Sequence, residues 1–287
     1  MTRTPLHHDR LPGDGVHLHV VRAGEGPPVV LLHGFPENWT TWLHQIDALV
    51  DAGFSVLAPD LRGYGASDRP RERDAYRIER LAADVAGVIR AAGAERATIV
   101  GHDWGGLIAW LVAGPYPELV GRLVILNAPH PRIFRRQVLR SSQALRSWYL
   151  LPAQIPIVAE AVLSAADFRV LRTMFRVMPV RPHAFSSARI DAFIDDLKRP
   201  GALTAALEYY RANRRLRGAV GGGVGRIDVP TLVLWGERDP ALGTALLNGL
   251  DELVADLSIV RFADVGHWIQ NEAPEEINRE ILRFLKG

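Results

Sequence analysis

In the stretch Ile99-Val100-Gly101-His102-Asp103-Trp104-Gly105-Gly106, a β-branched apolar run stops at a glycine and an amphipathic segment begins. An apolar run that ends at a glycine is typical of a buried strand, and the residues that follow have the periodicity of a helix. The stretch therefore predicts a strand, a sharp turn and a helix. Asp103 lies at the centre of the turn, which makes its carboxylate the first candidate for a reactive group.

The residue type at position 103 decides which chemistry the turn can support. Gly101, Asp103 and Gly105 have the spacing of the hydrolase motif Gly-x-Ser-x-Gly, in which a strained turn exposes the central side chain above a parallel sheet. A serine that attacked a saturated carbon would become an ether, whereas an aspartate becomes an ester that water can cleave. With a reference pKa of about 3.9, the carboxylate needs no base to ionise it. Such short matches also arise as ordinary turns, so the rest of the chain must supply partners.

Length and composition are those of a globular α/β protein. The chain has 287 residues and is 48% hydrophobic, enough for one large domain or for a core with an inserted cap. Residues 1–15 are polar and contain no signal-like apolar run, and no segment approaches the roughly 18 apolar residues of a membrane span. We expect a cytoplasmic protein without a membrane span. The absence of cysteine excludes disulfides, thiolate catalysis and cysteine-based metal sites.

Charge is distributed unevenly along the chain. The formal net charge is +2, but residues 127–217 carry 15 arginines and one lysine against six acidic residues, a balance of +10 that leaves −8 for the remainder. A basic segment can meet acidic substrates, a membrane surface or nucleic acid. Here the basic residues are scattered among apolar helical positions, which favours a solvated, arginine-rich outer face and predicts no nucleic-acid partner.

Apolar runs and helical patterns alternate along most of the chain. Strands are predicted at residues 15–22, 28–32, 54–58, 97–100, 122–126, 231–235 and 258–262, and helices at 38–50, 78–92, 107–113 and 274–286. The first of these strands alternates loosely and is expected to be an antiparallel edge strand. Residues 28–32 form a short, continuous apolar run, which is typical of a strand buried on both faces, and residues 54–58 are expected to be another buried strand. The sequence therefore predicts a mostly parallel central sheet flanked by helices.

One long segment interrupts this alternation. Helical patterns follow one another from about residue 129 to 217 with no convincing strand, so we expect residues 1–128 and 218–287 to form the α/β core and residues 129–217 to form an inserted all-helical cap. Residues 218–225, with three consecutive glycines, are expected to be a flexible return connection. His7, His8 and Asp9 lack convincing metal-ligand spacing and are expected to be a mobile terminus, and no metal site is predicted.

An ester on Asp103 needs a base that activates water. His267 follows the last predicted strand, and Asp239 follows the strand before it. Loops at the carboxyl ends of parallel strands meet at one edge of a sheet, so all three side chains are expected to converge there. The order nucleophile, acid, histidine is that of the α/β-hydrolases. Each residue alone could be an ordinary loop residue, but their joint occurrence in this order favours a catalytic triad.

Three motifs together resemble one family over nearly the whole chain. They are His33-Gly34-Phe35-Pro36, the stretch around Asp103, and Gly266-His267-Trp268, and they resemble the epoxide hydrolase branch of the α/β-hydrolase fold. The resemblance implies that the backbone N–H groups of Phe35 and Trp104 form an oxyanion hole. It further implies that no cofactor is needed, that the loop at residues 60–68 is structural, and that the protein forms a homodimer.

The same resemblance implies two tyrosine acids in the cap. The segments Ser147-Trp148-Tyr149-Leu150-Leu151 and Ala206-Leu207-Glu208-Tyr209-Tyr210-Arg211 resemble the family's two tyrosine motifs, with Tyr149 and Tyr210 in the functional positions. An opening epoxide becomes an alkoxide and needs an acid, whereas a departing halide does not. Tyr209 beside Tyr210 leaves an ambiguity of one residue over the second donor.

Two other functions use the same fold. Haloalkane and haloacid dehalogenases also have an aspartate nucleophile, but the former usually carry Asn where this chain has Phe35, although they share the tryptophan at Trp104. Fluoroacetate dehalogenases place arginines where this chain has Trp104 and Leu107. The third interpretation is a non-catalytic small-molecule receptor, which would have no need of five catalytic groups.

The sequence thus predicts an epoxide hydrolase that forms a hydroxyalkyl ester on Asp103 and releases a vicinal diol. His267 must be neutral to activate water, which places its action above a pKa near 6.5 if that value is unperturbed. The substrate pocket is expected to involve Phe35, Trp104, Trp148, Leu150 and Trp268. Further apolar cap residues, Leu151, Ile155, Ile157 and Val158, extend this apolar set. An apolar epoxide and water are therefore the expected small-molecule partners.

Overall fold

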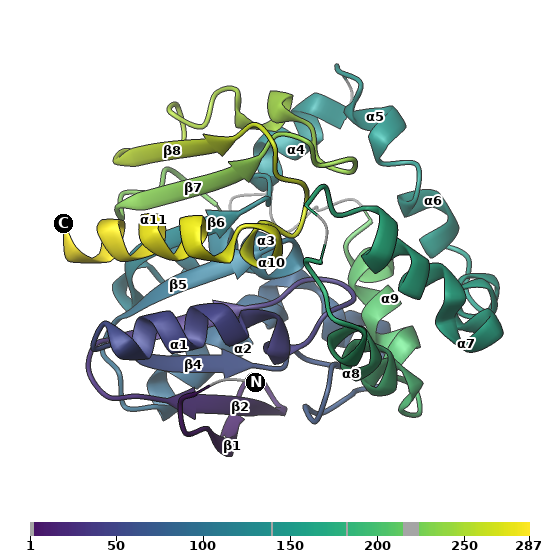
Figure 1. Ribbon diagram of the computed structural model, residues 1–287, viewed down its shortest axis with the longest axis horizontal. Helices are drawn as coiled ribbons and strands as arrows, with labels where there is room; N and C mark the ends of the chain where they lie inside the picture. The colour runs from purple at the N-terminus through teal and green to yellow at the C-terminus, as the bar shows by residue number, and fades with distance from the viewer. Residues whose placement is uncertain (1–2, 139, 182, 215–223) are drawn as a thin grey trace.

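A single eight-stranded sheet forms the centre of the molecule (Figure 1). The computed structural model describes residues 3–138, 140–181, 183–214 and 224–287. The strands lie in the order β1-β2-β4-β3-β5-β6-β7-β8; β1 and β2 are antiparallel to their neighbours, and the strands from β4 to β8 are mutually parallel. Their bounds are β1 (His7–Pro12), β2 (His17–Ala23), β3 (Pro28–Leu32), β4 (Ser55–Pro59), β5 (Ala97–His102), β6 (Val120–Leu126), β7 (Thr231–Gly236) and β8 (Leu257–Phe262). The mostly parallel sheet predicted from the sequence is confirmed.

Alternate residues of each central strand enter two separate hydrophobic cores. In β3, Val30 and Leu32 face one core, whereas Val29 and Leu31 face the other. Successive side chains of a strand point to opposite faces, so a strand buried on both sides must be apolar throughout. The register Leu32↔Gly101 brings the carboxyl ends of β3 and β5 to the same edge of the sheet. The loops that follow these strands therefore lie together.

Helices cover both faces of the sheet. Helices α1 (Leu43–Asp51) and α11 (Pro274–Lys286) pack against each other on one face, next to the short α10 (Ile269–Glu272). Helices α2 (Ile78–Ala91) and α3 (Trp104–Ala113) cover the other face, and every residue of α3 is buried. Short 3-10 helices complete the core: η1 (Trp39–Trp42), η2 (Arg73–Tyr76), η3 (Pro117–Leu119) and η5 (Thr244–Leu247).

Six α-helices lie between β6 and β7 among the residues that the structure describes there. They are α4 (Pro131–Val138), α5 (Gln143–Arg146), α6 (Leu150–Ala153), α7 (Val158–Val177), α8 (Ser187–Lys198) and α9 (Ala202–Ala212). Helix α7 is interrupted by non-helical backbone from Ala165 to Phe168. Figure 1 shows α6 to α9 gathered on the side of the molecule opposite the C-terminus. We call residues 129–217 the cap, and this boundary stays a prediction; most of the glycine-rich connection predicted at 218–225 lies outside the described residues.

Two local predictions are corrected. The terminus expected to be mobile forms β1, which pairs with β2 from His7↔Arg22 to Pro12↔His17, so β1 rather than β2 is the edge strand. The side chains of β1 are mostly exposed and polar, and its stability comes from backbone pairing that leaves no hydrophobic alternation to detect. The helix expected at 38–50 is divided into η1 and α1, because the Asn38 side chain accepts the Thr40 N–H and caps a 3-10 turn first.

The cap is fixed to the core through α9. Arg73 of the core donates to Glu208 at 2.6 Å, and the hydroxyl of Tyr209 donates to the backbone carbonyl of Arg62 at 2.7 Å. The side chain of Asn213 adds bonds to the backbone of Ile78 and of Tyr76. In these contacts the polar groups of the cap and of the core satisfy each other's hydrogen bonds, so α9 has a defined position over the core. Within the described ranges, no helix is long and apolar enough to cross a membrane.

Candidate active site

Asp103 occupies a strained turn between β5 and α3. Its backbone has φ 50° and ψ −120°, a conformation that residues other than glycine rarely adopt. The neighbouring glycines are required by close backbone contacts. A Cβ on Gly101 would lie 2.4 Å from the carbonyl oxygen of Gly105, and a Cβ on Gly105 would lie 2.1 Å from that of Leu32. The Gly-x-Asp-x-Gly spacing therefore reflects a tight crossing of strand and helix that exposes Asp103.

One oxygen of the Asp103 carboxylate is held by the loop after β3. The backbone N–H of Phe35 donates to Oδ1 of Asp103 at 2.9 Å, and the Phe35–Pro36 peptide bond is cis. Gly34 allows this approach, because a Cβ there would lie 2.5 Å from the Cβ of Asp103. Trp104 is the first residue of α3, so its N–H has no partner within the helix and is the predicted second donor. This arrangement can stabilise negative charge on Oδ1.

His267 stands between two carboxylates. Its Nδ1 donates to Oδ2 of Asp239 at 2.6 Å, and its Nε2 lies 3.8 Å from Oδ2 of Asp103. Asp239 is itself fixed, because its Oδ1 accepts the N–H groups of Ala241 and Leu242 at 2.7 and 2.9 Å. The structure thus brings together the three residues that the sequence predicted as nucleophile, acid and base.

The two flanking carboxylates control the charge of His267. Burial lowers the pKa of the imidazole, but the negative charge and hydrogen bond of Asp239, with a further contribution from Asp103, raise it to about 9. Burial raises the pKa of Asp239, but the charge of His267 and the hydrogen bonds from His267, Asn127 and Leu242 together outweigh burial and lower it. In the free protein at neutral pH, His267 is therefore an imidazolium between two carboxylates, and the unperturbed pKa near 6.5 does not apply.

Asn127 is a site residue that the sequence reasoning missed. It lies directly after β6 with φ 37° and donates from Nδ2 to Oδ2 of Asp239 at 2.8 Å. Its amide also pairs with the last residue of β7, since the N–H of Gly236 donates to Oδ1 of Asn127 at 2.8 Å. A polar residue at the carboxyl end of a parallel strand was the available signal.

A buried pair, Glu37 and His102, lies next to the backbone of His267, and the sequence reasoning missed it as well. Nδ1 of His102 lies 3.0 Å from Oε2 of Glu37, and Nε2 of His102 lies 2.9 Å from the backbone carbonyl oxygen of His267. Both side chains are fully buried. Burial raises the pKa of Glu37, but the interactions with His102, the hydrogen bond from Thr41 and the influence of His33 together outweigh burial and lower it. Through the contact of His102 with the carbonyl oxygen, the pair helps to fix the backbone of His267.

Glu272 holds the same loop from its other side. Its carboxylate accepts the N–H of Gly266 at 3.0 Å and that of Trp268 at 3.2 Å, the two residues that flank His267. It also accepts the N–H of Val180 in the cap at 2.7 Å. The side chain is only 6% exposed. No sequence pattern pointed to Glu272, because its partners are backbone groups brought together by the fold.

The cap brings both tyrosine candidates toward the nucleophile. The ring of Tyr210 lies edge-on to those of Phe35, Trp104 and Tyr149, with centroids 5.5, 5.1 and 6.5 Å away. Burial and the charge of Asp103 raise the pKa of both Tyr149 and Tyr210, which keeps the two phenols protonated. The hydroxyl of Tyr209 is bonded to the core instead. This geometry favours Tyr210 over Tyr209 as the second donor.

The pocket prediction needs one correction. Phe35, Trp104 and Trp268 surround the site and Leu150 is partly buried, but Trp148 is 67% exposed and lies outside it. The further apolar residues that the sequence assigned to the pocket are exposed as well: Leu151, Ile155, Ile157 and Val158. Only part of a short helix can face inward, and Tyr149 takes the inward position next to Trp148. Apolar composition alone did not distinguish the two faces.

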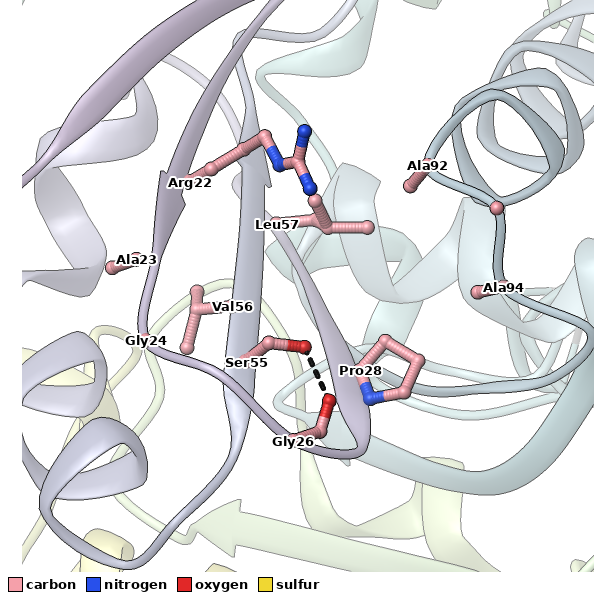
Figure 2. A pocket seen from close by; sticks show the side chains of 11 residues that line it. Arg22, Ala23, Gly24, Gly26, Pro28, Ser55, Val56, Leu57, Ala92 and Ala94 are labelled. Carbon is pink, nitrogen blue, oxygen red and sulfur yellow. Dashed lines mark hydrogen bonds between the residues drawn. The ribbon is translucent and has the colours of Figure 1, made fainter.

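A separate cavity of about 200 Å³ lies where β3 and β4 begin (Figure 2). It is therefore at the amino ends of the parallel strands, whereas Asp103 lies at their carboxyl ends. Arg22, Pro28, Leu57 and Ala94 line it, and a hydrogen bond from Ser55 to the carbonyl oxygen of Gly26 crosses its wall. It contains none of the predicted site residues. In the described part of the chain, no group of three His, Cys, Asp or Glu side chains could hold a metal ion.

Comparisons with known proteins identify the family of the chain. The family model described as the alpha/beta hydrolase fold matches residues 27–274. The chain is 37% identical to Epoxide hydrolase A of Mycobacterium tuberculosis, over 96% of this chain and 95% of that protein. It is 39% identical to the AB hydrolase superfamily protein YfhM of Bacillus subtilis, over 96% of both chains.

A solved structure extends the likeness to three dimensions. It is a variant of an epoxide hydrolase from Bacillus megaterium, complexed with its product (R)-3-[1]naphthyloxy-propane-1,2-diol. The TM-score is 0.89 at 31% sequence identity, covering 97% of this chain and 100% of that chain. Fold and site define an α/β-hydrolase. Within that class, the chain belongs to the epoxide hydrolase family.

Proposed function

We propose that this protein hydrolyses apolar epoxides to vicinal diols through a covalent ester on Asp103. The observation that carries the proposal is the arrangement around the carboxylate. Oδ1 of Asp103 is held by the N–H of Phe35, while Oδ2 lies on the side of His267. Two protonated tyrosines of the cap lie close by. A nucleophile, an acid and a base for the two half-reactions are thus available in one place.

In the first half-reaction, Oδ2 of Asp103 attacks an epoxide carbon and the C–O bond of the ring breaks. Tyr149 and Tyr210 donate hydrogen bonds to the ring oxygen and supply its proton as it becomes an alkoxide. Their raised pKa suits them to protonate a strongly basic oxygen without ionising beforehand. The product of this step is a neutral hydroxyalkyl ester.

In the second half-reaction, water attacks the carbonyl carbon of the ester. Forming the ester removes the charge of Asp103, which is one cause of the raised pKa of His267. The pKa of His267 falls, and the imidazolium passes its proton to the tyrosinate that the first half-reaction left behind. The neutral ring then removes a proton from the attacking water, and the N–H groups of Phe35 and Trp104 stabilise the oxyanion. As the oxyanion collapses, the ester C–O bond breaks and the leaving alkoxide takes the proton of the newly added hydroxyl group, so the diol leaves and the carboxylate forms again.

An apolar, aromatic-bearing epoxide is the substrate class that fits best. The aromatic side chains of Phe35, Trp104 and Trp268 surround the site, and they offer apolar contacts rather than charge. The Bacillus megaterium relative is described with a naphthyl ether diol as its product, which is of this class. The homodimer and the cytoplasmic location that the sequence suggested stay predictions.

Replacing the base tests the two-step scheme. In the His267→Gln variant we expect alkylation by styrene oxide to continue and ester hydrolysis to stop, so that the alkyl-enzyme accumulates. Mass spectrometry of the intact protein would show one added substrate mass. A variant that turns over without accumulating adduct would contradict the scheme. Halide release from short bromoalkanes that survives Tyr149→Phe and Tyr210→Phe, without diol formation from epoxides, would indicate a dehalogenase instead.

A further inference from the structure

The outer surface of the cap carries an unusual amount of exposed apolar side chain. Ten large hydrophobic side chains are exposed in the part of the chain that the structure describes, and nine of them lie between residues 145 and 177. Leu151 is 74% exposed and Ile157 81%. Exposed apolar residues are normal when scattered singly, but a concentration of this kind marks an interaction site.

Seven of these side chains follow one another along α5, α6 and the first half of α7. We call them the outer cap face: Leu145, Trp148, Leu151, Ile155, Ile157, Val158 and Val162. The first four recur every three or four residues, and helical turns join them, since the N–H of Leu151 donates to the carbonyl of Trp148 at 3.1 Å. A further bond, from Ala159 to the carbonyl of Ile155 at 3.1 Å, leads into α7. Figure 1 shows α5, α6 and α7 along the outer side of the cap.

The cap segment that carries this face has an excess of positive charge along the sequence, although one of its arginines, Arg136, pairs with Glu252 of the core at 3.8 Å. Residues 128–159 contain five arginines and no acidic residue. The next acid, Glu160, is bound by Arg211 at 2.7 Å and so does not offset them. Arg146, within the face, donates to the backbone carbonyls of Asp239 and Pro240, which leaves its positive charge without a carboxylate partner at those contacts. Apolar side chains and an excess of positive charge therefore occur in one segment.

We propose that the outer cap face binds the surface of an anionic lipid bilayer. Apolar side chains with a tryptophan would enter the boundary between headgroups and acyl chains, while arginines contact lipid phosphates. This combination of apolar area and positive charge is that of segments that lie on a membrane without crossing it. The inference goes beyond the proposed reaction, and its test does not depend on enzymatic activity.

A second copy of the chain fits this face less well. In a two-fold dimer the same surface meets itself, so the acid-free, arginine-bearing segment would face its own like charges. A head-to-tail contact with the acidic remainder of the chain, whose balance is −8, avoids that repulsion. Such a contact gives a ring if the rotation between copies closes and growing assemblies if it does not. An anionic bilayer offers both complementary charge and an apolar phase.

Vesicle binding with a tryptophan readout tests the proposal. Trp148 is the exposed tryptophan, since Trp39 is partly buried and five others are buried: Trp42, Trp104, Trp110, Trp235 and Trp268. We expect the protein to sediment with phosphatidylglycerol-containing vesicles and not with pure phosphatidylcholine. Lipids brominated near the headgroup should quench Trp148. High salt should weaken the binding.

A matched pair of variants assigns the binding to this face. Leu151→Ser combined with Ile157→Ser keeps the Trp148 reporter, and we expect it to weaken vesicle binding about tenfold or more. Ile259→Ser, which removes an exposed apolar side chain from β8, should bind as the unaltered protein does. Thermal melting checks that each variant is folded.

Three results would overturn the proposal. The first is no binding of the unaltered protein to anionic vesicles. The second is binding that the Leu151→Ser/Ile157→Ser variant retains in full. The third is a dimer or larger assembly in light scattering that this variant alone disrupts, which would assign the outer cap face to a second copy of the chain.

Discussion

At the scale of single residues, the site is organised by the charge of His267. Asp239 holds the imidazole through a hydrogen bond of 2.6 Å, and Asp103 adds a second negative charge at 3.8 Å. The proposed reaction removes only the second charge, because ester formation neutralises Asp103. The pKa of the base therefore falls at the step that needs it neutral. This coupling does not require any movement of the protein.

The coupling can be measured without substrate. The Asp103→Asn variant has a neutral side chain of nearly the same shape as an ester carbonyl group. We expect the pKa of His267, raised to about 9 in the unaltered protein, to fall in this variant. Titration of the imidazole nitrogens by NMR measures both values. Equal pKa values in the two proteins would contradict the proposed control of the base.

The same residue links stability to pH. The pKa of His267 is raised from 6.5 to about 9 in the folded protein. A group with a raised folded-state pKa stabilises the fold fully below its unfolded pKa, and that contribution is lost as the pH rises through the folded value. The free energy of unfolding in urea should therefore decline between about pH 6.5 and 9. His267→Gln should show a smaller decline over that window.

Two adjacent tyrosines provide a matched comparison. Tyr210→Phe removes a proposed acid and should slow alkylation about 100-fold with little change in stability. Tyr209→Phe removes the hydrogen bond to the buried carbonyl of Arg62, so it should cost about 1 to 2 kcal/mol of stability and leave alkylation nearly unchanged. Stopped-flow alkylation and urea unfolding measure the two effects. The reverse pattern would make Tyr209 the second donor.

At the scale of elements, the loop between β8 and α10 determines where the base lies. Glu272 accepts N–H groups from both neighbours of His267 and from Val180 of the cap. The Glu37–His102 pair contacts the carbonyl of His267 itself. Glu37, His102 and Glu272 all lie within a few residues of the catalytic motifs, but sequence spacing does not show which groups their side chains contact. Backbone contacts between distant segments are determined by the fold.

Glu272→Gln tests this positioning role. An amide places an NH₂ group against N–H donors, so the loop should shift and ester hydrolysis should slow about tenfold or more, while alkylation changes little. Glu276→Gln is the control, because the Glu276 carboxylate binds the Arg181 side chain of the cap, whereas the Glu272 carboxylate accepts the N–H groups that flank His267. Single-turnover kinetics separate the two steps. Equal slowing of both steps, or none, would contradict a positioning role for Glu272.

At the scale of the whole molecule, the sequence predicted the parallel sheet, the inserted helices and the convergence of Asp103, Asp239 and His267. Continuous apolar strands and the order of three reactive residues carry that information. The strand β1 was missed because backbone pairing leaves no hydrophobic pattern. Trp148 was assigned to the pocket because composition shows that the cap is apolar, not which side of a short helix faces the core. Asn127 was missed although its place directly after a parallel strand was a signal, and Glu272 was missed because its role depends on backbone contacts that form only in the fold.

One measurement tests the central claim most directly: a single turnover of excess enzyme with styrene oxide in ¹⁸O-labelled water. The proposed route predicts a diol product and ¹⁸O in the peptide that contains Asp103, because water attacks the carbonyl carbon of the ester and leaves its oxygen on the carboxylate. Label found only in the diol, with none in Asp103, would show direct attack of water on the epoxide and would contradict the ester mechanism.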